Sequence, residues 1–188
     1  MIQTCYLALL RGINVGGNNI IKMADLKKCF ESMGFDEVST YIQSGNVLFK
    51  SAEKHKSKLE DGIEHALSKR FNCKSRVALV TDKELKKIVE AAPKGFGQSP
   101  DKYRYDVIFL NEPITAKEAM KSVSTREGVD ADHAGKDVLY FSRLIARATQ
   151  SHLPKVIQKP VYEFMTIRNW NTTTRLLEMM NKPASSVQ

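Results

Sequence analysis

The segment at residues 11–19 combines residue types that bind anions. It reads RGINVGGNN and carries glycines at positions 12, 16 and 17. Glycine adopts positive φ and lets the backbone approach a ligand closely, and successive backbone N–H groups in such a loop form an anion-binding nest. Arg11 adds a guanidinium that can bind a phosphate or carboxylate through two parallel hydrogen bonds. We therefore expect this loop to hold an anionic group.

The loop matches neither of the two familiar phosphate-binding signatures. A P-loop ends in G-K-[ST] and a dinucleotide fold carries G-x-G-x-x-G, and neither spacing occurs here. A structural alternative stays open. In that alternative the asparagines at positions 14, 18 and 19 bond to their own backbone, and Arg11 pairs with a carboxylate at the boundary between two subdomains.

Two further segments carry candidate binding residues. Residues 43–46 read QSGN, a composition typical of a tight hairpin turn. Binding would be an additional role of the same turn. Residues 168–172 read RNWNT and hold the only tryptophan, and Arg and Trp are frequent anchors at interfaces. The structural alternative is that Asn169 or Asn171 caps a helix, Trp170 lies in the core and Arg168 bridges the subdomains. The candidate ligand-binding residues are Arg11, Asn14, Gly16, Gly17, Asn18, Gln43, Ser44, Asn46, Arg168 and Asn169.

Catalytic and metal-binding patterns are scarce in this sequence. The histidines at positions 55, 65, 133 and 152 lack the spacing of metal ligands, and no C-x-x-C pair occurs. We therefore expect no metal and no cofactor, assign no catalytic residue, and favour a binding protein over an enzyme. Two alternatives stay open: a metal-independent small-molecule enzyme with a site between subdomains, and a structural or protein-interaction module.

The charge balance permits a polyanionic partner. The formal net charge is +8. Between residues 139 and 175 there are six Lys or Arg residues against the single acid Glu163, and residues 142–151 form a basic, hydroxyl-rich segment that could contact phosphates. A nucleotide or a nucleic acid is therefore the expected partner. The alternative is that these basic residues form a solvent-exposed face without a partner, which would give the same sequence pattern. An RNA-binding sheet with Tyr6 as a stacking residue is a further alternative.

The composition describes a globular, intracellular chain. Hydrophobic residues make up 42% and charged residues 27% of the 188 residues. No apolar run approaches the roughly 18 residues that a membrane helix needs. The first ten residues lack the basic start and cleavage site of a signal peptide, and the three cysteines are far apart. We expect a cytoplasmic protein that does not enter the membrane, and its protein partners cannot be read from this pattern.

The elements that position the candidate residues follow from hydrophobic periodicity. Strands are expected at residues 4–10, 38–42, 47–49 and 76–80, with helices after the first strand, after Ser51 as a cap, and after residues 81–84, which form a capping box. This is the β-α-β-β-α-β order of ferredoxin-like folds. In that order the first two strands run parallel with the third between them. The loop at residues 11–19 and the turn at residues 43–46 should therefore be neighbours.

The pattern then repeats. Strands are expected near residues 105–110, 128–132, 138–141 and 164–167, with a helix after residue 115, a short helix at 151–158 and a final helix. We predict an α+β protein with two ferredoxin-like subdomains, mostly antiparallel sheets with helices packed on one face. The expected boundaries are 1–92, including a trailing helix, a linker at 93–104, and 105–188, ending in a C-terminal helix.

Three segments resemble one known family. Residues 9–17, 41–47 and 168–172 occur in the order found in the family called domain of unknown function 1697, and the resemblance extends from Cys5 to about Leu177. The resemblance implies a bacterial-type cytoplasmic protein with two ferredoxin-like subdomains. It implies no activity and no catalytic residue.

Overall fold

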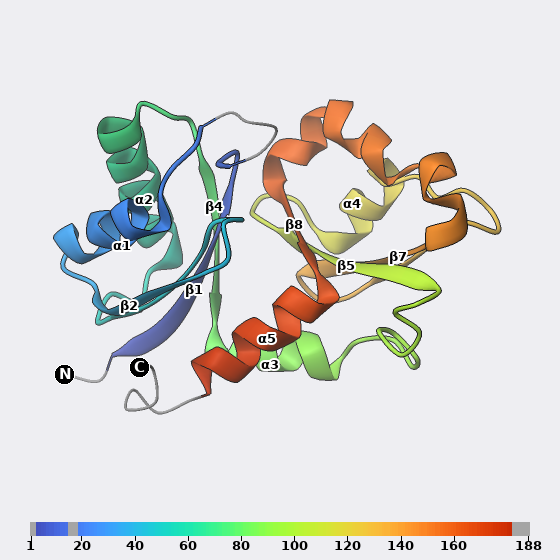
Figure 1. Cartoon of the computed structure of the whole chain (residues 1–188), viewed down its shortest axis with the longest axis horizontal. Helices are drawn as coiled ribbons and strands as arrows, with labels where there is room; N and C mark the ends of the chain where they lie inside the picture. The colour runs from blue at the N-terminus through green and yellow to red at the C-terminus, as the bar shows by residue number, and fades with distance from the viewer. Residues whose placement is uncertain (1–2, 15–18, 182–188) are drawn as a thin grey trace. The chain divides into compact units, whose positions relative to one another are not determined.

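The structure is a computed structural model that describes residues 3–14 and 19–181. The chain divides into two compact units, Met1–Leu85 with Leu176–Gln188, and Lys86–Arg175. Each unit contains a four-stranded antiparallel sheet together with helices (Figure 1). The predicted α+β class with two subdomains is therefore confirmed.

The first unit has the element order that the hydrophobic pattern predicts. Its elements are β1 (Thr4–Arg11), α1 (Met23–Ser32), β2 (Asp36–Tyr41), β3 (Asn46–Ser51), α2 (Lys56–Phe71) and β4 (Arg76–Thr81). The sheet order is β2-β3-β1-β4, and every neighbouring pair is antiparallel. Consequently β1 and β2 run in the same direction with β3 between them, as expected. Helix α3 (Asp82–Glu90) follows β4 directly and continues into the second unit.

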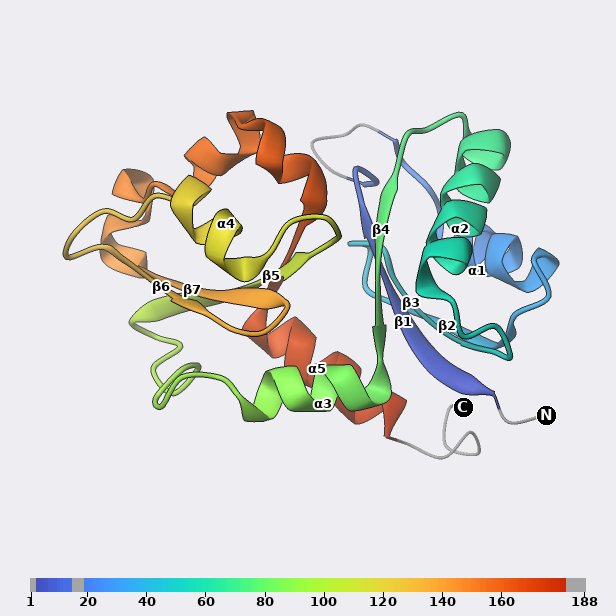
Figure 2. The same ribbon diagram turned by 180° about the vertical axis from the view of Figure 1, so that it is seen from behind.

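The core of the first unit lies under α1 and α2, which cover one face of the sheet (Figure 2). Leu26 and Phe30 on α1 and Ile63 on α2 are fully buried. Tyr6 on β1 is buried in the same cluster, and its ring stacks on Phe49 with 5.5 Å between centroids. The alternative in which Tyr6 stacks on a nucleic-acid base is therefore wrong, because the tyrosine is only 2% exposed.

The start of α2 differs from the prediction that Ser51 caps it. Ser51 is the last residue of β3, and its Oγ accepts a hydrogen bond from the backbone N–H of Glu53. The helix begins at Lys56, after His55, without a side-chain cap. Serine hydroxyls bond to nearby backbone in turns as readily as at helix starts, so the residue type alone did not distinguish the two.

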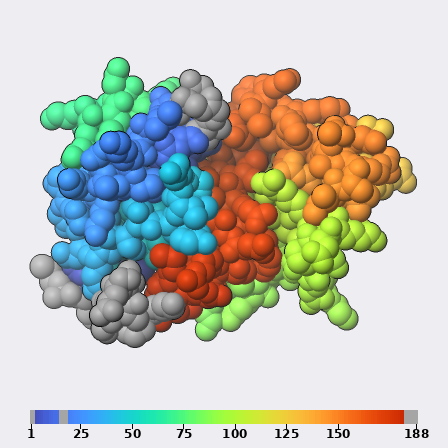
Figure 3. Space-filling model, in the orientation of Figure 1, coloured from blue at the N-terminus to red at the C-terminus, as the bar shows by residue number. Residues whose placement is uncertain are grey.

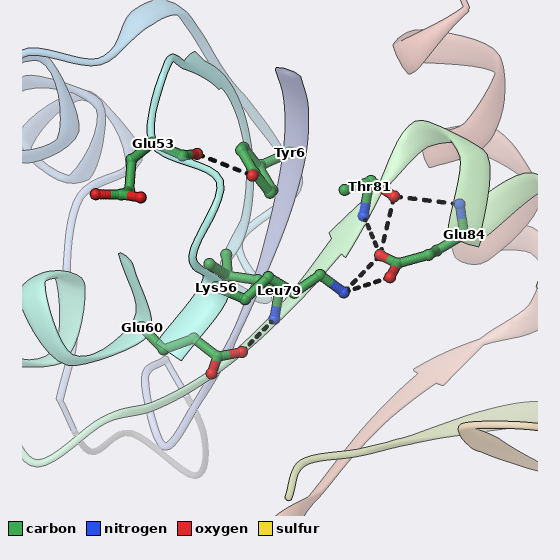
Figure 4. Close-up of polar contacts among 7 residues, drawn as sticks. All are labelled: Tyr6, Glu53, Lys56, Glu60, Leu79, Thr81 and Glu84. Atoms are coloured by element: carbon green, nitrogen blue, oxygen red, sulfur yellow. Dashed lines mark hydrogen bonds and ion pairs between the residues drawn. The ribbon is translucent and has the colours of Figure 1, made fainter. Parts of the chain in front are cut away.

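Strand β4 is an edge strand whose outward N–H groups are bonded to glutamate side chains, and Figure 4 shows these bonds at Leu79 and Thr81. The bonds are Val77 N–H to Glu64 Oε1 at 3.0 Å, Leu79 N–H to Glu60 Oε1 at 3.1 Å and Thr81 N–H to Glu84 Oε2 at 2.8 Å. Unpaired groups on an edge strand invite pairing with another chain. The three carboxylates occupy those donors and add an acidic charge along the edge.

The second unit repeats the topology of the first. Its elements are β5 (Tyr103–Leu110), α4 (Ala116–Ser122), β6 (Asp130–Ala134), β7 (Val138–Leu144), β8 (Met165–Asn169) and the start of α5 (Trp170–Met180), a helix whose residues from Leu176 onward belong to the first unit. The sheet order is β6-β7-β5-β8, again antiparallel throughout. Helix α5, drawn in red, reaches the protein surface (Figure 3), and exposed residues recur along it.

The second unit departs from the first between β7 and β8. Three short 3₁₀ helices, η1 (Ile145–Gln150), η2 (Leu153–Gln158) and η3 (Pro160–Phe164), stand where one α-helix would complete the fold. The predicted helix at residues 151–158 is therefore a 3₁₀ helix at residues 153–158. Pro154 and Pro160 each lack a backbone N–H and favour the first positions of short helices, which explains the interruption.

Candidate functional site

Asn14 holds together the two ends of the loop at residues 11–19, which we call the Gly/Asn loop. Its Nδ2 donates to the backbone oxygen of Ile21 at 3.1 Å, and its Oδ1 accepts from Ile21 N–H at 2.7 Å. Its backbone N–H donates to the oxygen of Asn19 at 3.1 Å, and Asn19 Nδ2 donates to Gly12 O at 2.7 Å. Asn14 also adopts a positive φ of 52°. These two amide side chains thus bond to their own loop, as the structural alternative expects.

The turn at residues 43–46 lies against the same loop. Asn14 Nδ2 donates to Gln43 O at 2.9 Å, and Leu10 N–H donates to Gly45 O at 2.8 Å. Asn46 is fully buried, and its Nδ2 donates to Tyr41 O at 3.0 Å and to Ser44 Oγ at 2.9 Å. The proximity of loop and turn that the strand order predicts is therefore present.

Gly45 makes this close approach sterically feasible. Its φ is +74°, and a Cβ at this position would lie 2.8 Å from Ile13 Cδ1 and 2.9 Å from Leu10 Cβ. Only glycine fits both the backbone conformation and the space.

Arg11 is the last residue of β1 and lies at the start of the Gly/Asn loop. It lies opposite Arg76 in the register of β1 and β4, and its side chain is half-buried. Arg76 forms an ion pair with Glu64 at 3.1 Å, and the backbone oxygen of Arg11 accepts from Ser75 Oγ at 2.8 Å. Among the candidate residues, Gly16, Gly17 and Asn18 lie outside the described residues. The structure thus places Arg11, Asn14, Gln43, Ser44 and Asn46 together at one end of the first sheet.

Arg168 and Asn169 lie in the second unit, at the end of β8. Asn169 Oδ1 accepts from Asn171 N–H at 3.0 Å, which makes it the cap of α5, and its Nδ2 donates to Tyr105 O at 3.1 Å. Arg168 is 9% exposed and donates to Ile167 O at 2.9 Å. Burial lowers the pKa of the Arg168 guanidinium to about 10. Both side chains therefore have structural contacts in this unit.

A pocket of about 500 Å³ opens within the second unit, at the end of its sheet. Two arginines line it, Arg104 from β5 and Arg143 from β7, and they are directly opposite each other in the strand register. The remaining lining residues are Pro100, Tyr103, Tyr105, Ile145, Ala148, Asn169, Trp170 and Asn171. The pocket thus combines cationic groups with aromatic and aliphatic walls.

Asp106 lies beneath the two arginines, two residues along β5 from Arg104. Its carboxylate is 3.6 Å from Arg104 Nε and 3.4 Å from Arg143 Nη2, and its side chain is 3% exposed. Burial raises the pKa of Asp106 above its ordinary value, even though both arginines act to lower it. Perturbed carboxyl groups beside a pocket are frequent at functional sites.

Most guanidinium donors at this site have no partner among the described residues. Arg143 donates a single hydrogen bond, the one to Asp106, and its buried Nε has no hydrogen-bond partner in the described part of the chain. The side chain of Arg104 is 56% exposed. Two cations and one carboxylate leave a net positive charge, so the pocket can accept an anion through several N–H groups.

Aromatic packing fixes one wall of the pocket. Phe96 makes edge-on contacts with Tyr105, Tyr140 and Trp170, with centroids 4.9, 5.4 and 5.1 Å apart. Gly97 permits this packing, because a Cβ there would lie 2.3 Å from Trp170 Nε1. Trp170 is therefore a half-buried wall of the pocket rather than a fully buried core residue.

Sequence reasoning singled out Arg143 and Asn169 but missed Arg104, Asp106 and the tyrosines beside them. The available signal was the run Tyr103-Arg104-Tyr105-Asp106, in which charged residues alternate with aromatic ones inside a strand. Alternation at period two places Arg104 and Asp106 on one face. Their meeting with Arg143, however, depends on the pairing register of β5 and β7.

Two negative findings apply to the described residues alone. No cluster of three or more His, Cys, Asp or Glu residues there could hold a metal ion. No helix in residues 3–14 and 19–181 is long and apolar enough to cross a membrane.

Comparisons with known proteins agree with the fold. A family model described as "Protein of unknown function (DUF1697)" matches residues 3–140. A solved structure, described as that of the conserved bacterial protein SP0830 from Streptococcus pneumoniae, is 26% identical, with a TM-score of 0.82. The match covers 96% of this chain and 100% of that chain. The search of curated proteins finds no match.

Proposed function

The chain belongs to the DUF1697 family of proteins of unknown function, and we propose that it binds a small organic anion in the Arg104–Arg143 pocket. The observation that carries this proposal is the pair of guanidinium groups lining a pocket of about 500 Å³ over one buried carboxylate. Ligand pockets commonly have volumes of roughly 300–1,000 Å³. Two arginines held side by side are well suited to a phosphate group.

The walls of the pocket favour a ligand with a flat ring beside its anionic group. Tyr103, Tyr105 and Trp170 supply aromatic surface, and Ile145 and Ala148 supply aliphatic surface. Aromatic side chains stack on nucleobases, and such contacts tolerate any base because every base has a π-face. A nucleoside monophosphate combines both features, and we take it as the ligand class. The three cysteines are free thiols, which agrees with a place in the bacterial cytoplasm.

The Gly/Asn loop is a second candidate location for the same class of ligand. The side chains of Asn14, Asn19 and Asn46 already bond within the first unit. An anion there would therefore be held by backbone N–H groups and by Arg11. Residues 16–18, which would supply part of such a nest, lie outside the described residues.

Fluorescence of Trp170 provides a direct test, because it is the only tryptophan and it lines the pocket. Nucleoside monophosphates should change its emission and raise the melting temperature. Arg104→Gln and Arg143→Gln should weaken binding by about tenfold to a hundredfold, since hydrogen bonds to charged groups contribute about 1.5–3 kcal/mol. Arg147→Gln is the matched control, because Arg147 is exposed, lies outside the pocket lining and bonds to Gln150.

The outcomes separate the two locations. If Arg11→Gln weakens binding while both pocket variants bind like the unaltered protein, the ligand binds at the loop and the pocket proposal fails. Unchanged binding in both pocket variants, or no response to any nucleotide, also contradicts it. Short oligonucleotides test the nucleic-acid alternative: affinity for them should fall steeply with salt if several phosphates are neutralised.

A further inference from the structure

Asp106 is placed to control the charge of the pocket. It occupies a helix-covered position on β5, and Phe141 is its partner in the register. Its distances of 3.6 and 3.4 Å to the two arginines exceed the roughly 2.7–2.9 Å of a strong charge-assisted hydrogen bond. The carboxylate is therefore close enough to fix the arginines electrostatically without occupying most of their donors.

The charged neighbours of Asp106 are few. Arg104 and Arg143 are the charged groups that act on the pKa of this carboxyl. Opposite it on β8 lies Asn169, whose amide is uncharged and bonds to Tyr105 O, and the pocket residues from η1 are apolar. On β6, Asp130 lies opposite Arg143, and its Oδ2 accepts the N–H groups of two other residues. Its buried Oδ1 has no hydrogen-bond partner among the described residues.

We propose that an anion entering this pocket takes over the two guanidinium groups and that Asp106 binds a proton at the same time. The proton comes from the solvent buffer and forms an O–H bond on the Asp106 carboxylate. The buried negative charge of Asp106 is thereby exchanged for the negative charge of the ligand. This inference rests on the anion binding proposed above and adds that the binding is coupled to pH.

The physical reason is the competition between two anions for the same cations. An anion on the arginines adds a like charge near Asp106 and draws guanidinium donors away from it. Both effects favour the protonated carboxyl. Burial already raises the pKa of Asp106 in the empty pocket, and ligand binding raises the pKa further. Binding therefore takes up a proton when the pH lies between the lower, empty-pocket pKa and the higher, ligand-bound pKa.

The sign of the pH dependence follows from this order. Below both pKa values Asp106 is already protonated, and affinity is high and constant. Affinity then falls as the pH rises through the window, by at most tenfold per pH unit, because one proton is exchanged. Above both values affinity is low and constant.

Inorganic sulfate is the probe, because it remains a dianion at every pH above about 4 and adds no titration of its own. Its binding is followed by Trp170 emission for the unaltered protein, for Asp106→Asn and for the exposed-acid control Asp137→Asn. We expect the affinity of the unaltered protein and of the control to fall with pH. Asp106→Asn should bind sulfate at least as tightly as the unaltered protein does at its acidic limit, with a flat profile.

A second measurement needs no variant. Titration calorimetry of the unaltered protein with sulfate, in two buffers of different ionisation enthalpy, should show proton uptake within the window. Sulfate binding with a flat pH profile and no uptake overturns the coupling while leaving anion binding intact. A folded Asp106→Asn protein that no longer binds sulfate also overturns it, because Asp106 would then be a structural support. If neither sulfate nor nucleotides bind, the proposed function itself fails.

Discussion

Replacing Glu84 by alanine should destabilise the protein by about 1.5–2.5 kcal/mol. Its carboxylate accepts hydrogen bonds from Thr81 N–H at 2.8 Å and Thr81 Oγ1 at 2.9 Å, and it forms an ion pair with Lys56 at 2.5 Å (Figure 4). In return, Thr81 Oγ1 accepts from Glu84 N–H at 3.3 Å, so the two residues form the capping box predicted for α3. Alanine removes every contact of the Glu84 carboxylate but keeps the backbone N–H that donates to Thr81 Oγ1.

The expected loss of stability is the sum of two contributions, one from the hydrogen bonds with Thr81 and one from the ion pair with Lys56. Losing the Glu84 carboxylate half of the capping box and leaving an edge-strand N–H without its acceptor costs about 1–2 kcal/mol. The ion pair adds only about 0.5 kcal/mol, because the side chains of Lys56 and Glu84 are 36% and 43% exposed and solvent screens their attraction. Lys56→Met should therefore cost about 0.5 kcal/mol by itself.

Urea unfolding at neutral pH measures these differences, and α3 offers a matched control. Glu90 lies on the same helix, and its pair with Lys86 is 3.8 Å long with side chains 63% and 62% exposed. Glu90→Ala should change the free energy of unfolding by less than about 0.5 kcal/mol. If Glu84→Ala costs no more than Glu90→Ala, the carboxylate does not support the edge strand as argued.

The pH dependence of the Glu84 contribution provides an independent check. Burial acts to raise the pKa of Glu84, but its bonds with Lys56 and Thr81 outweigh burial and lower the pKa below the ordinary value of 4.5. A lowered folded pKa means that the stabilisation is complete above about pH 4.5 and is lost as the pH falls through the folded value. The stability difference between the unaltered protein and Glu84→Ala should therefore shrink in acid.

Two backbone predictions concern the turn beside the Gly/Asn loop. Gly45→Ala should destabilise the protein by about 2–4 kcal/mol in thermal or urea unfolding, because the added Cβ would meet Ile13 at a φ of +74°; a loss below about 1 kcal/mol would contradict this packing. Ile42 has a φ of +48° although it is β-branched, and it is 49% exposed. Ile42→Asn should stabilise the protein by about 0.5–1 kcal/mol, since asparagine tolerates this conformation better, and a lowered melting temperature would refute that reasoning.

Hydrophobic periodicity was sufficient to predict the topology of both units. Strand-length apolar runs, helical spacing after Met23 and the capping box at Thr81 each depend on local residue patterns. The order of elements then implied that the Gly/Asn loop meets the turn at residues 43–46, as the bond from Asn14 to Gln43 shows. Local sequence patterns were therefore enough to predict that the Gly/Asn loop and the turn at residues 43–46 lie side by side.

The pocket could not be predicted in the same way, because it depends on register and on an irregular segment. Arg104 and Arg143 are 39 positions apart in the sequence, and a shift of one residue in the pairing of β5 and β7 would separate them. The 3₁₀ helices that replace the second helix also have no periodic signature beyond Pro154 and Pro160. The sequence showed that Arg143 is basic but not which residue lies opposite it.

Comparing the two units explains why the pocket belongs to the second. In the first unit, Tyr6 pairs with Phe49 under the helices, and the pair two residues nearer the strand end is Thr4 with Ser51. In the second unit, the corresponding pairs are Asp106 with Phe141 and Arg104 with Arg143.

A charged group therefore replaces the buried Tyr6 ring of the first unit. Burying Asp106 costs free energy that its two ion pairs, 3.6 and 3.4 Å long, offset only in part. An apolar residue at this position would complete the core, as Tyr6 does in the first unit. The polar cluster is thus placed where it weakens the fold, and the proposed binding of an anion would account for this placement.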